Sequence, residues 1–310
     1  MKGDRKDWPD LLLLAEDALR TATESPKWGA VLVDEFQDLN LCGLSIVKRL
    51  ALLRPSNLFF GGDHRQRIFR TLPCFKDAGI SIVGRSFGLS ENYRNTPEIY
   101  DAARSIYGGT GEDPDGEEPD TRVLHFGRPH AELPVLRGFP SACLEDEWIV
   151  SEIASLLEGG ASPGDIAILS LAKKRSSGFA HKVLASTIEL DGSAGGRSAY
   201  FNPESLKLST IHGSKGLEFP IVFLVGMSLN EFKDHPWVKT EDDPKAAIDA
   251  LLYVAMTRAR DRLYVSFSGP PLRTLCSANS SVFSTDDVTR SMLTQRRHQR
   301  ISATSHLSSS

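Results

Sequence analysis

The sequence predicts an α/β protein whose sheets are built from parallel strands. Short apolar runs recur along the chain, and several show no alternation of apolar and polar residues, as expected of strands covered on both faces by helices. Segments with helical periodicity lie between the runs, and this order of elements is typical of a parallel sheet. The predicted strands cover residues 30–33, 58–60, 80–83, 123–126, 166–169, 221–225 and 263–267.

Three helices are predicted between these strands. Leucine and valine recur every third residue after Asn40, which is a typical N-cap residue. Thr96 is followed by proline, the order of cap and first-turn residue that begins a helix. A third helix covers residues 145–158 and ends at Gly159.

The composition is that of an ordinary globular protein of one or two domains, with 310 residues of which 40% are hydrophobic and 25% charged. The net charge of -4 gives no overall attraction to nucleic acid, so DNA binding would need a local arrangement of charges. The 4 cysteines form no CxxC pair, which favours reduced thiols over a metal site or disulfides. No apolar stretch approaches the length of a membrane span or a signal peptide, so a cytoplasmic location is expected.

Two segments differ in composition from the rest of the chain. Residues 108–120, GGTGEDPDGEEPD, are predicted to form a solvated loop near an interdomain hinge, with a functional acidic patch as the alternative. After residue 269 the chain is rich in Ser, Thr and Arg, and a packed core is not expected there. The arginines of this tail could contact nucleic acid, but a solvated tail is the preferred interpretation.

The apolar run at residues 30–33 ends in two carboxylates, Asp34 and Glu35. In open α/β sheets, ligands bind at the carboxyl ends of the strands. Paired acids at such an end suit a Mg²⁺-nucleotide, because one carboxylate can hold the ion while the second accepts a proton from attacking water. On these residues alone, an acidic strand-to-helix turn without a function is an equal alternative.

Further motifs follow in order along the chain. The predicted strand at 58–60 leads into GGDHRQRIFR, and GLSENYRNTPEIY stands at 88–100. LKLSTIHGSKGLEFPIVFLVG occupies 206–226, and LLYVAMTRARDRLYVSF occupies 251–267. Together with GAVLVDEFQDLN at 29–40, these five ordered motifs make the chain resemble the superfamily 1 DNA helicases of the UvrD/Rep type over roughly residues 8–267.

The resemblance implies tandem RecA-like domains, which are parallel sheets of the P-loop NTPase type, with the first domain truncated at its N-terminus. Residues 1–88 correspond to the remnant of the first motor domain, with the Walker B strand and the glutamine motif. Residues 89–269 correspond to the second motor domain, and residues 270–310 to a disordered tail. Only residues 172–205 separate the strand DIAILSL from the motif at 206, so the family's large accessory subdomain is not expected.

The resemblance gives roles in Mg²⁺-ATP chemistry to residues of the first domain. Asp34 corresponds to the Mg²⁺ ligand, and Glu35 to the residue that activates the attacking water. Gln66 corresponds to the glutamine that senses the γ-phosphate. Asp34 and Glu35 stand directly after a predicted strand, where the sheet geometry places ligands, and Gln66 lies in the turn that follows the strand predicted at 58–60.

Residues of the second domain receive complementary roles from the same resemblance. Tyr93 corresponds to the ring that stacks on adenine, and Arg94 to a γ-phosphate contact, where planar bidentate hydrogen bonding favours arginine. Glu218 corresponds to the ribose contact, and Arg258 to the arginine finger. A half-buried packing residue is the alternative for Tyr93, and Arg260 is interpreted as a surface charge.

Contacts to single-stranded DNA are implied for Thr210, His212 and Lys215, which lie in the motif that links the nucleotide site to the DNA track. A capping or core histidine is the alternative for His212. The family often carries a tryptophan after its glutamine motif for stacking on DNA bases. Here residues 66–70 read QRIFR, so Phe69 is the candidate for such a contact.

The 310 residues contain no G-x-x-x-x-G-K-[ST], the P-loop whose backbone N–H groups and lysine bind phosphates. The glycine-rich stretch DGSAGGRSAYF at 191–201 has no lysine and is interpreted as a flexible loop. The segment DWPDLLLLAEDAL at 7–19 is similar to the family's segment just ahead of the Walker B strand. Because the P-loop strand lies inside the sheet of RecA-like domains, unpaired strand edges and uncovered apolar surface are expected.

These observations favour the C-terminal part of a UvrD-like, ATP-dependent 3′-5′ DNA helicase that uses ATP and Mg²⁺ and acts on single-stranded DNA. The chain alone is expected to bind ATP poorly and to hydrolyse it negligibly. Two alternatives remain: a non-catalytic DNA- or protein-binding remnant, or one half of a split motor completed by a polypeptide that carries the P-loop. No GxGxxG joins a strand to a helix, which argues against a dinucleotide-dependent oxidoreductase.

Overall fold

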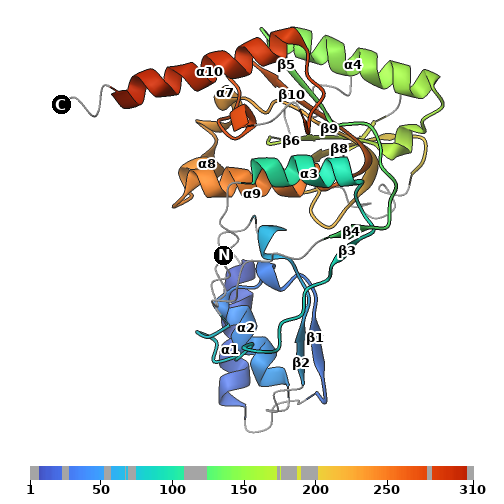
Figure 1. Ribbon diagram of the computed structural model, residues 1–310. Helices are drawn as coiled ribbons and strands as arrows, with labels where there is room; N and C mark the ends of the chain where they lie inside the picture. Colours follow the sequence, from blue (N-terminus) through green and yellow to red (C-terminus); the bar gives the residue numbers. More distant parts are fainter. Residues whose placement is uncertain are drawn as a thin grey trace, which may run out of the picture. The chain divides into compact units, whose positions relative to one another are not determined.

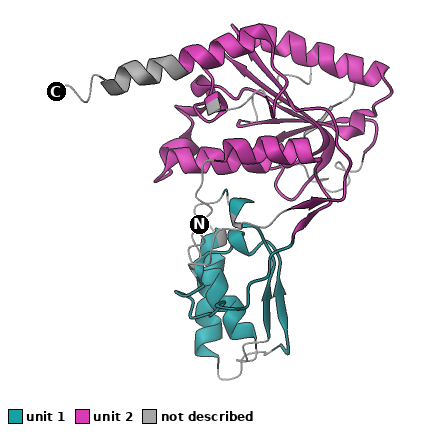
Figure 2. Ribbon diagram, in the orientation of Figure 1, with its two compact units in different colours: residues 1–89, 110–122 teal, residues 90–109, 123–310 magenta. Residues whose placement is uncertain are grey.

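The chain forms two compact units, residues 1–89 with 110–122 and residues 90–109 with 123–310 (Figure 2). The predicted loops at 108–120 and 191–201 lie outside the residues that the structure describes. This computed structural model describes residues 7–22, 28–51, 57–66, 68, 75–107, 124–172, 175, 187–189, 202–277 and 281–305.

Unit 1 combines two packed helices with a pair of parallel strands (Figure 1). Helix α1 (Trp8–Thr21) begins with a capping box, in which Asp7 and Asp10 each accept the other's backbone N–H. Helix α2 (Leu41–Leu50) begins at the predicted cap Asn40, whose Oδ1 accepts a hydrogen bond from Gly43 N at 2.8 Å. The remaining elements are β1 (Val31–Val33), η1 (Phe36–Asp38), β2 (Leu58–Phe60) and η2 (His64–Gln66).

The core of unit 1 is a cluster of Phe36, Leu44 and Phe75. The rings of Phe36 and Phe75 have centroids 5.1 Å apart, which lies within the usual range for favourable aromatic pairs. The strand predicted at residues 80–83 is wrong, because this described segment pairs with no strand. Its isoleucines pack against the aromatic cluster instead, so their apolar character serves the core rather than a sheet.

One face of the β1–β2 pair is open to solvent. The strands run parallel with Leu32 opposite Phe59, and these side chains are 74% and 65% exposed. The residues on either side of Leu32 and Phe59 point to the other face and are partly buried, which is where α1 and α2 lie (Figure 1). A two-stranded sheet with a bare apolar face is marginally stable at best.

Unit 2 is built on a six-stranded parallel sheet with the order β5-β10-β9-β6-β8-β7. The predicted parallel α/β fold is therefore confirmed. The last strand of the chain lies between β5 and β9 rather than at an edge. The strands are β5 (Val135–Phe139), β6 (Ile166–Ser170), β7 (Thr187–Glu189), β8 (Leu206–Thr210), β9 (Phe219–Leu224) and β10 (Ala259–Ser268).

Helices cover both faces of this sheet (Figure 1). Helix α4 (Ala142–Glu158) packs one face through Ile149 and Ile153, and it ends at Gly159 as predicted. Helices α3 (Pro97–Ile106) and α9 (Pro244–Met256) pack against each other and lie on the opposite face. No helix among the described residues is both long and apolar enough to cross a membrane.

Smaller elements complete unit 2. Thr96, the predicted cap of α3, accepts a hydrogen bond from Ile99 N. Shortly before this cap, residues 91–92 pair in parallel with residues 125–126. These elements are β3 (Glu91–Asn92), β4 (His125–Phe126), η3 (Pro163–Asp165), α7 (Leu229–Phe232), α8 (Pro236–Lys239) and η4 (Leu275–Ser277).

The predicted disordered tail over 270–310 is wrong for its described part. Helix α10 (Asp287–Ser305) lies beside edge strand β5, and Thr289 Oγ1 accepts a hydrogen bond from Gly138 N at 2.8 Å. Phe283 and Leu293 are buried. A few apolar residues are therefore enough to pack this Ser- and Arg-rich segment against the sheet. The prediction missed them because it rested on the average composition of the segment.

Candidate functional site

Asp34 and Glu35 directly follow β1, at its carboxyl end. Glu35 N donates to Asp34 Oδ1 at 2.9 Å, and the Asp34 side chain is exposed. Among the described residues, Glu35 is the one non-glycine with a positive φ, at 53°. This left-handed conformation costs about 1–2 kcal/mol for a residue with a side chain, so the contacts around it must hold the turn in place.

Gln37 joins Glu35 to the end of β2. Its side chain is buried; its Nε2 donates to Glu35 Oε2, and its Oε1 accepts a hydrogen bond from Asp63 N at 3.2 Å. Gly62 leaves room for this crossing, because a Cβ at that position would lie 2.2 Å from Gln37 Oε1. The buried amide therefore fixes the carboxylate of Glu35 relative to the second strand.

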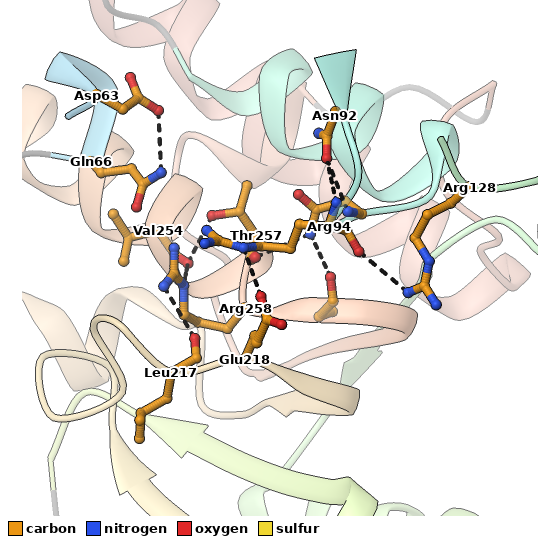
Figure 3. A network of polar contacts seen from close by, with 12 residues as sticks. Asp63, Gln66, Asn92, Arg94, Arg128, Leu217, Glu218, Val254, Thr257 and Arg258 are labelled. Atoms are coloured by element: carbon orange, nitrogen blue, oxygen red, sulfur yellow. Dashed lines mark hydrogen bonds and ion pairs between the residues drawn. The ribbon is translucent and has the colours of Figure 1, made fainter. Parts of the chain in front are cut away.

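Asp63 in turn holds the predicted glutamine (Figure 3). Its Oδ2 accepts from Gln66 Nε2 at 3.3 Å, and its Oδ1 accepts from Arg65 N at 2.9 Å. The Asp63 carbonyl also accepts from Gln66 N at 2.9 Å. Glu35 and Gln66 thus belong to one chain of contacts in unit 1 that passes through Gln37 and Asp63.

In unit 2, Arg94 and Glu218 form an ion pair (Figure 3). Arg94 Nε lies 2.8 Å from Glu218 Oε2, and the two side chains are 42% and 39% exposed. The turn that carries Arg94 is set by Asn92, whose Oδ1 accepts from the backbone N–H groups of Arg94 and Asn95. Because both charged groups remain accessible, the guanidinium can exchange its carboxylate partner for a phosphate.

Arg258, by contrast, is buried at 1% exposure. Its Nε donates to the Val254 carbonyl at 3.0 Å and its Nη1 to the Leu217 carbonyl at 3.1 Å (Figure 3). Its own carbonyl accepts from Phe219 N at 2.9 Å. Backbone carbonyls therefore hold the predicted arginine finger, and these two bonds use two of the five N–H donors of its guanidinium.

The ring of Tyr93 is 70% exposed. It lies against Gly127, where an added Cβ would be 2.3 Å from Tyr93 Cδ1. The alternative of a half-buried packing residue is wrong, because most of the ring is accessible. A ring held on one side by backbone and open on the others suits stacking with a planar ligand.

The turn after β8 carries three predicted DNA-contacting residues. Thr210 Oγ1 accepts a backbone N–H from three residues further on at 3.0 Å, and Lys215 N donates to the His212 carbonyl at 3.3 Å. The His212 ring meets the Trp237 ring edge-on, with centroids 5.0 Å apart. Phe69 lies outside the described residues.

The structure thus groups the predicted residues in two sets, one in each unit. The sequence reasoning gave no role to Gln37 or Asp63, although both stand inside the motif strings directly after strand ends. It also gave no role to Trp237, for which the sequence offers no local signal. Asp63 and Gln37 could have been found by asking which polar residues follow each strand.

Models of two protein families match the chain. Residues 2–84 match the UvrD/REP helicase N-terminal domain, and residues 192–269 match the UvrD-like helicase C-terminal domain. The first match lies in unit 1 and the second in unit 2.

Individual proteins are also similar to the chain. A protein of Mycoplasma pneumoniae described as a probable DNA helicase is 29% identical over 259 residues, which are 80% of this chain and 45% of that protein. The ATP-dependent DNA helicase PcrA of Staphylococcus epidermidis is 45% identical over 60 residues, 19% of this chain and 8% of that helicase. A solved C-terminal domain of a possible DNA helicase from a Lactobacillus aligns with a TM-score of 0.44 and 15% identity, covering 63% of this chain and 99% of that domain.

Proposed function

Because the chain belongs to the UvrD-like DNA helicase family, we propose that it is the C-terminal part of an ATP-dependent 3′-5′ DNA helicase. The complete motor would couple ATP hydrolysis to translocation on single-stranded DNA. The chain spans less than half the length of the Mycoplasma relative, 45%, so the activity of the whole motor is part of this proposal. A cytoplasmic location belongs to the proposal as well.

The observation that carries the proposal is the network in unit 2. It connects Arg94, Glu218 and Arg258 through short contacts, although the sequence separates the first from the last by most of the unit. Two arginines and an acid connected in this way suit a polyanionic ligand that also carries hydroxyl groups, as a nucleoside triphosphate does. An incidental surface charge would not be buried and held by backbone carbonyls, as the Arg258 guanidinium is.

The end of β1 fits a Mg²⁺-nucleotide in its donor chemistry. Asp34 offers an exposed carboxylate, the kind of oxygen ligand that Mg²⁺ prefers, and it would hold the ion. When bound, the ion would neutralise charge on the phosphate oxygens. Glu35, oriented by Gln37, would accept the proton of the attacking water.

The 310 residues alone are proposed to lack ATPase activity, because they contain no P-loop to bind the phosphates. The test is steady-state ATP hydrolysis by the purified chain with and without single-stranded DNA, beside a Glu35→Gln variant. We expect both proteins to match the buffer blank. DNA-stimulated turnover that disappears in Glu35→Gln would refute this part of the proposal.

The helicase assignment itself is tested on the polypeptide that the transcript encodes. Mapping the 5′ end of the transcript shows whether codons for a P-loop precede Met1 in frame. If they do, the longer polypeptide should hydrolyse ATP in the presence of single-stranded DNA and lose this activity on Glu35→Gln. A folded longer polypeptide without ATPase activity would overturn the assignment.

A second candidate is one half of a split motor, or a non-catalytic remnant that binds DNA or protein. The open face of β1 and β2, with Leu32 and Phe59 exposed, favours the split motor, since it offers apolar surface for another chain. Isolation of the native protein followed by mass spectrometry separates these candidates. A stoichiometric partner that carries G-x-x-x-x-G-K-[ST] supports the split motor, and its absence supports the remnant.

A further inference from the structure

Three segments of unit 2 that are far apart in sequence meet around the two candidate phosphate-binding arginines. Residues 92–95 carry Arg94, residues 217–219 carry its partner Glu218, and residues 257–259 carry Arg258. Glu218 contacts the first segment through its side chain, while its two neighbours bond to Arg258 through their backbone atoms. These contacts join the first segment to the second and the second to the third.

Asn95 joins the first segment directly to the third. Its side chain is buried at 3% exposure, and its Nδ2 donates to the carbonyls of Thr257 and Ala259 at 3.0 and 2.5 Å. These two carbonyls flank Arg258 on either side. Because both partners are acceptors, only the NH₂ side of the amide can satisfy them, and its two hydrogens match the two carbonyls.

The backbone N–H of Asn95 shares the Asn92 side chain with Arg94, so the amide and Arg94 belong to one rigid turn. The turn is then followed at once by Thr96, the cap of α3. A displacement of Asn95 would therefore move Arg94, and a break of its two bonds would free the backbone around Arg258. The amide is the element that links the position of one arginine to that of the other.

We propose that Asn95 is a positioning residue that fixes Arg258 relative to Arg94 by clamping the carbonyls of Thr257 and Ala259. This inference rests on the proposed function, in which both arginines bind phosphate. Charged groups that stabilise a transition state act best when they are held in place before the reaction. Asn95 contributes no group to the ligand and acts through the backbone of its partner.

The test follows the buried guanidinium by NMR in the complete 310-residue chain, so it does not depend on ATP hydrolysis. Arg258 Nε–H is bonded to Val254 and shielded from water. Loss of two buried hydrogen bonds in Asn95→Ala should speed the exchange of this proton by roughly tenfold. Asn95→Asp, which keeps the shape but removes both donors, should do the same.

Asn202→Ala is the matched control, because Asn202 lies in the same unit and its side-chain Oδ1 accepts a hydrogen bond from a nearby backbone N–H, that of Glu204. It should leave the exchange of Arg258 Nε–H unchanged. Unchanged exchange in folded Asn95→Ala would overturn the proposal. Equal acceleration by Asn202→Ala would also overturn it, because the effect would then be a general loss of stability.

A measurement on the unaltered protein keeps the proposal testable if the variants do not fold. The Asn95 side-chain amide protons should exchange roughly a hundredfold more slowly than those of a solvated asparagine, as expected for two buried bonds. Fast exchange of these protons would refute the clamp. If the clamp is found and a folded longer polypeptide with a P-loop shows no ATPase activity, the proposed function fails while the positioning of Arg258 by Asn95 stands.

Discussion

The replacement of Glu145 tests the interior of unit 2 most directly. This carboxylate is fully buried at the start of α4, where its Oε1 accepts from Gly226 N at 2.9 Å and from Ser266 Oγ at 2.7 Å. Its Oε2 lies 2.9 Å from Arg175 Nη2. Burial lowers the pKa of Arg175, but Glu145 and Asp146 more than offset this effect, so the pKa lies above its ordinary value.

Glu145→Ala should lower the free energy of unfolding by about 3–5 kcal/mol. Breaking a buried ion pair from one side costs about 3–5 kcal/mol, because it leaves the other charge poorly compensated. Two buried donors, Gly226 N and Ser266 Oγ, also lose their acceptor, at about 1–3 kcal/mol each. Because Asp146 still pairs with Arg175, the loss of Glu145 costs less than a fully broken pair would, and the expected total stays at about 3–5 kcal/mol.

Glu145→Gln should cost less, about 1–3 kcal/mol, because the amide oxygen still accepts from Gly226 and Ser266 while the charge opposite Arg175 is lost. Glu147→Ala is the control on the same helix; this side chain is exposed, so its loss should stay within about 0.5 kcal/mol.

Urea unfolding followed by circular dichroism and tryptophan fluorescence measures all three changes. Trp148 reports from the same helix, since its ring packs 5.4 Å from that of Phe139. A Glu145→Ala variant within about 1 kcal/mol of the unaltered protein would refute the reasoning, because a broken buried pair must cost more. A Glu145→Gln variant as unstable as Glu145→Ala would refute the role given to the two retained acceptor contacts.

Three further predictions concern other parts of the chain. Gly127→Ala should displace the Tyr93 ring at a cost to unfolding below about 1 kcal/mol, since the ring can turn into solvent; unchanged NMR shifts of the Tyr93 ring would contradict this. Burial raises the pKa of Glu98, but hydrogen bonds to His130 and to a backbone N–H lower it by more than burial raises it. The folded-state pKa therefore lies below the ordinary 4.5. Its stabilisation is therefore full above pH 4.5 and is lost as the pH falls through the folded-state pKa; Glu98→Gln should weaken this acid dependence in urea titrations, and an identical pH profile would exclude it. Leu44→Ala should destabilise unit 1 by about 2–5 kcal/mol, because Leu44 is fully buried in its small core; hydrogen exchange of α2 amides that stays as slow as before would count against that core.

Nearly all the elements that local signals predicted are present in the structure, although these signals missed several others, among them β5, β8 and α9. The caps at Asn40 and Thr96 are confirmed, because a cap depends on a side chain and on backbone groups only a few residues away. The strand β5 escaped prediction, since Arg137 and Gly138 interrupt its apolar run. Its packing is supplied by residues more than a hundred positions away, which no local window contains.

The same limit applies to the candidate site, where local patterns predicted residue types but not the contacts between distant residues. Motif strings identified the residue types at strand ends, and the roles of Asp34, Glu35 and Gln66 in ATP chemistry remain predictions. The strings could not show that Arg94 pairs with Glu218 or that Asn95 reaches the backbone around Arg258. Such pairings depend on how the sheet brings distant segments together, and the spacing of residues along the chain does not encode that.

The position of β10 has a consequence for how the protein is made. This strand is the last of the sheet to leave the ribosome, yet it lies between β5 and β9 and pairs with both. Until residue 268 has emerged, the nascent chain holds β5 without its described neighbour and β9 with one bare edge, a state prone to aggregation. A stop codon shortly before β10 would therefore remove an interior strand rather than an edge, and the product would depend on chaperones or be degraded.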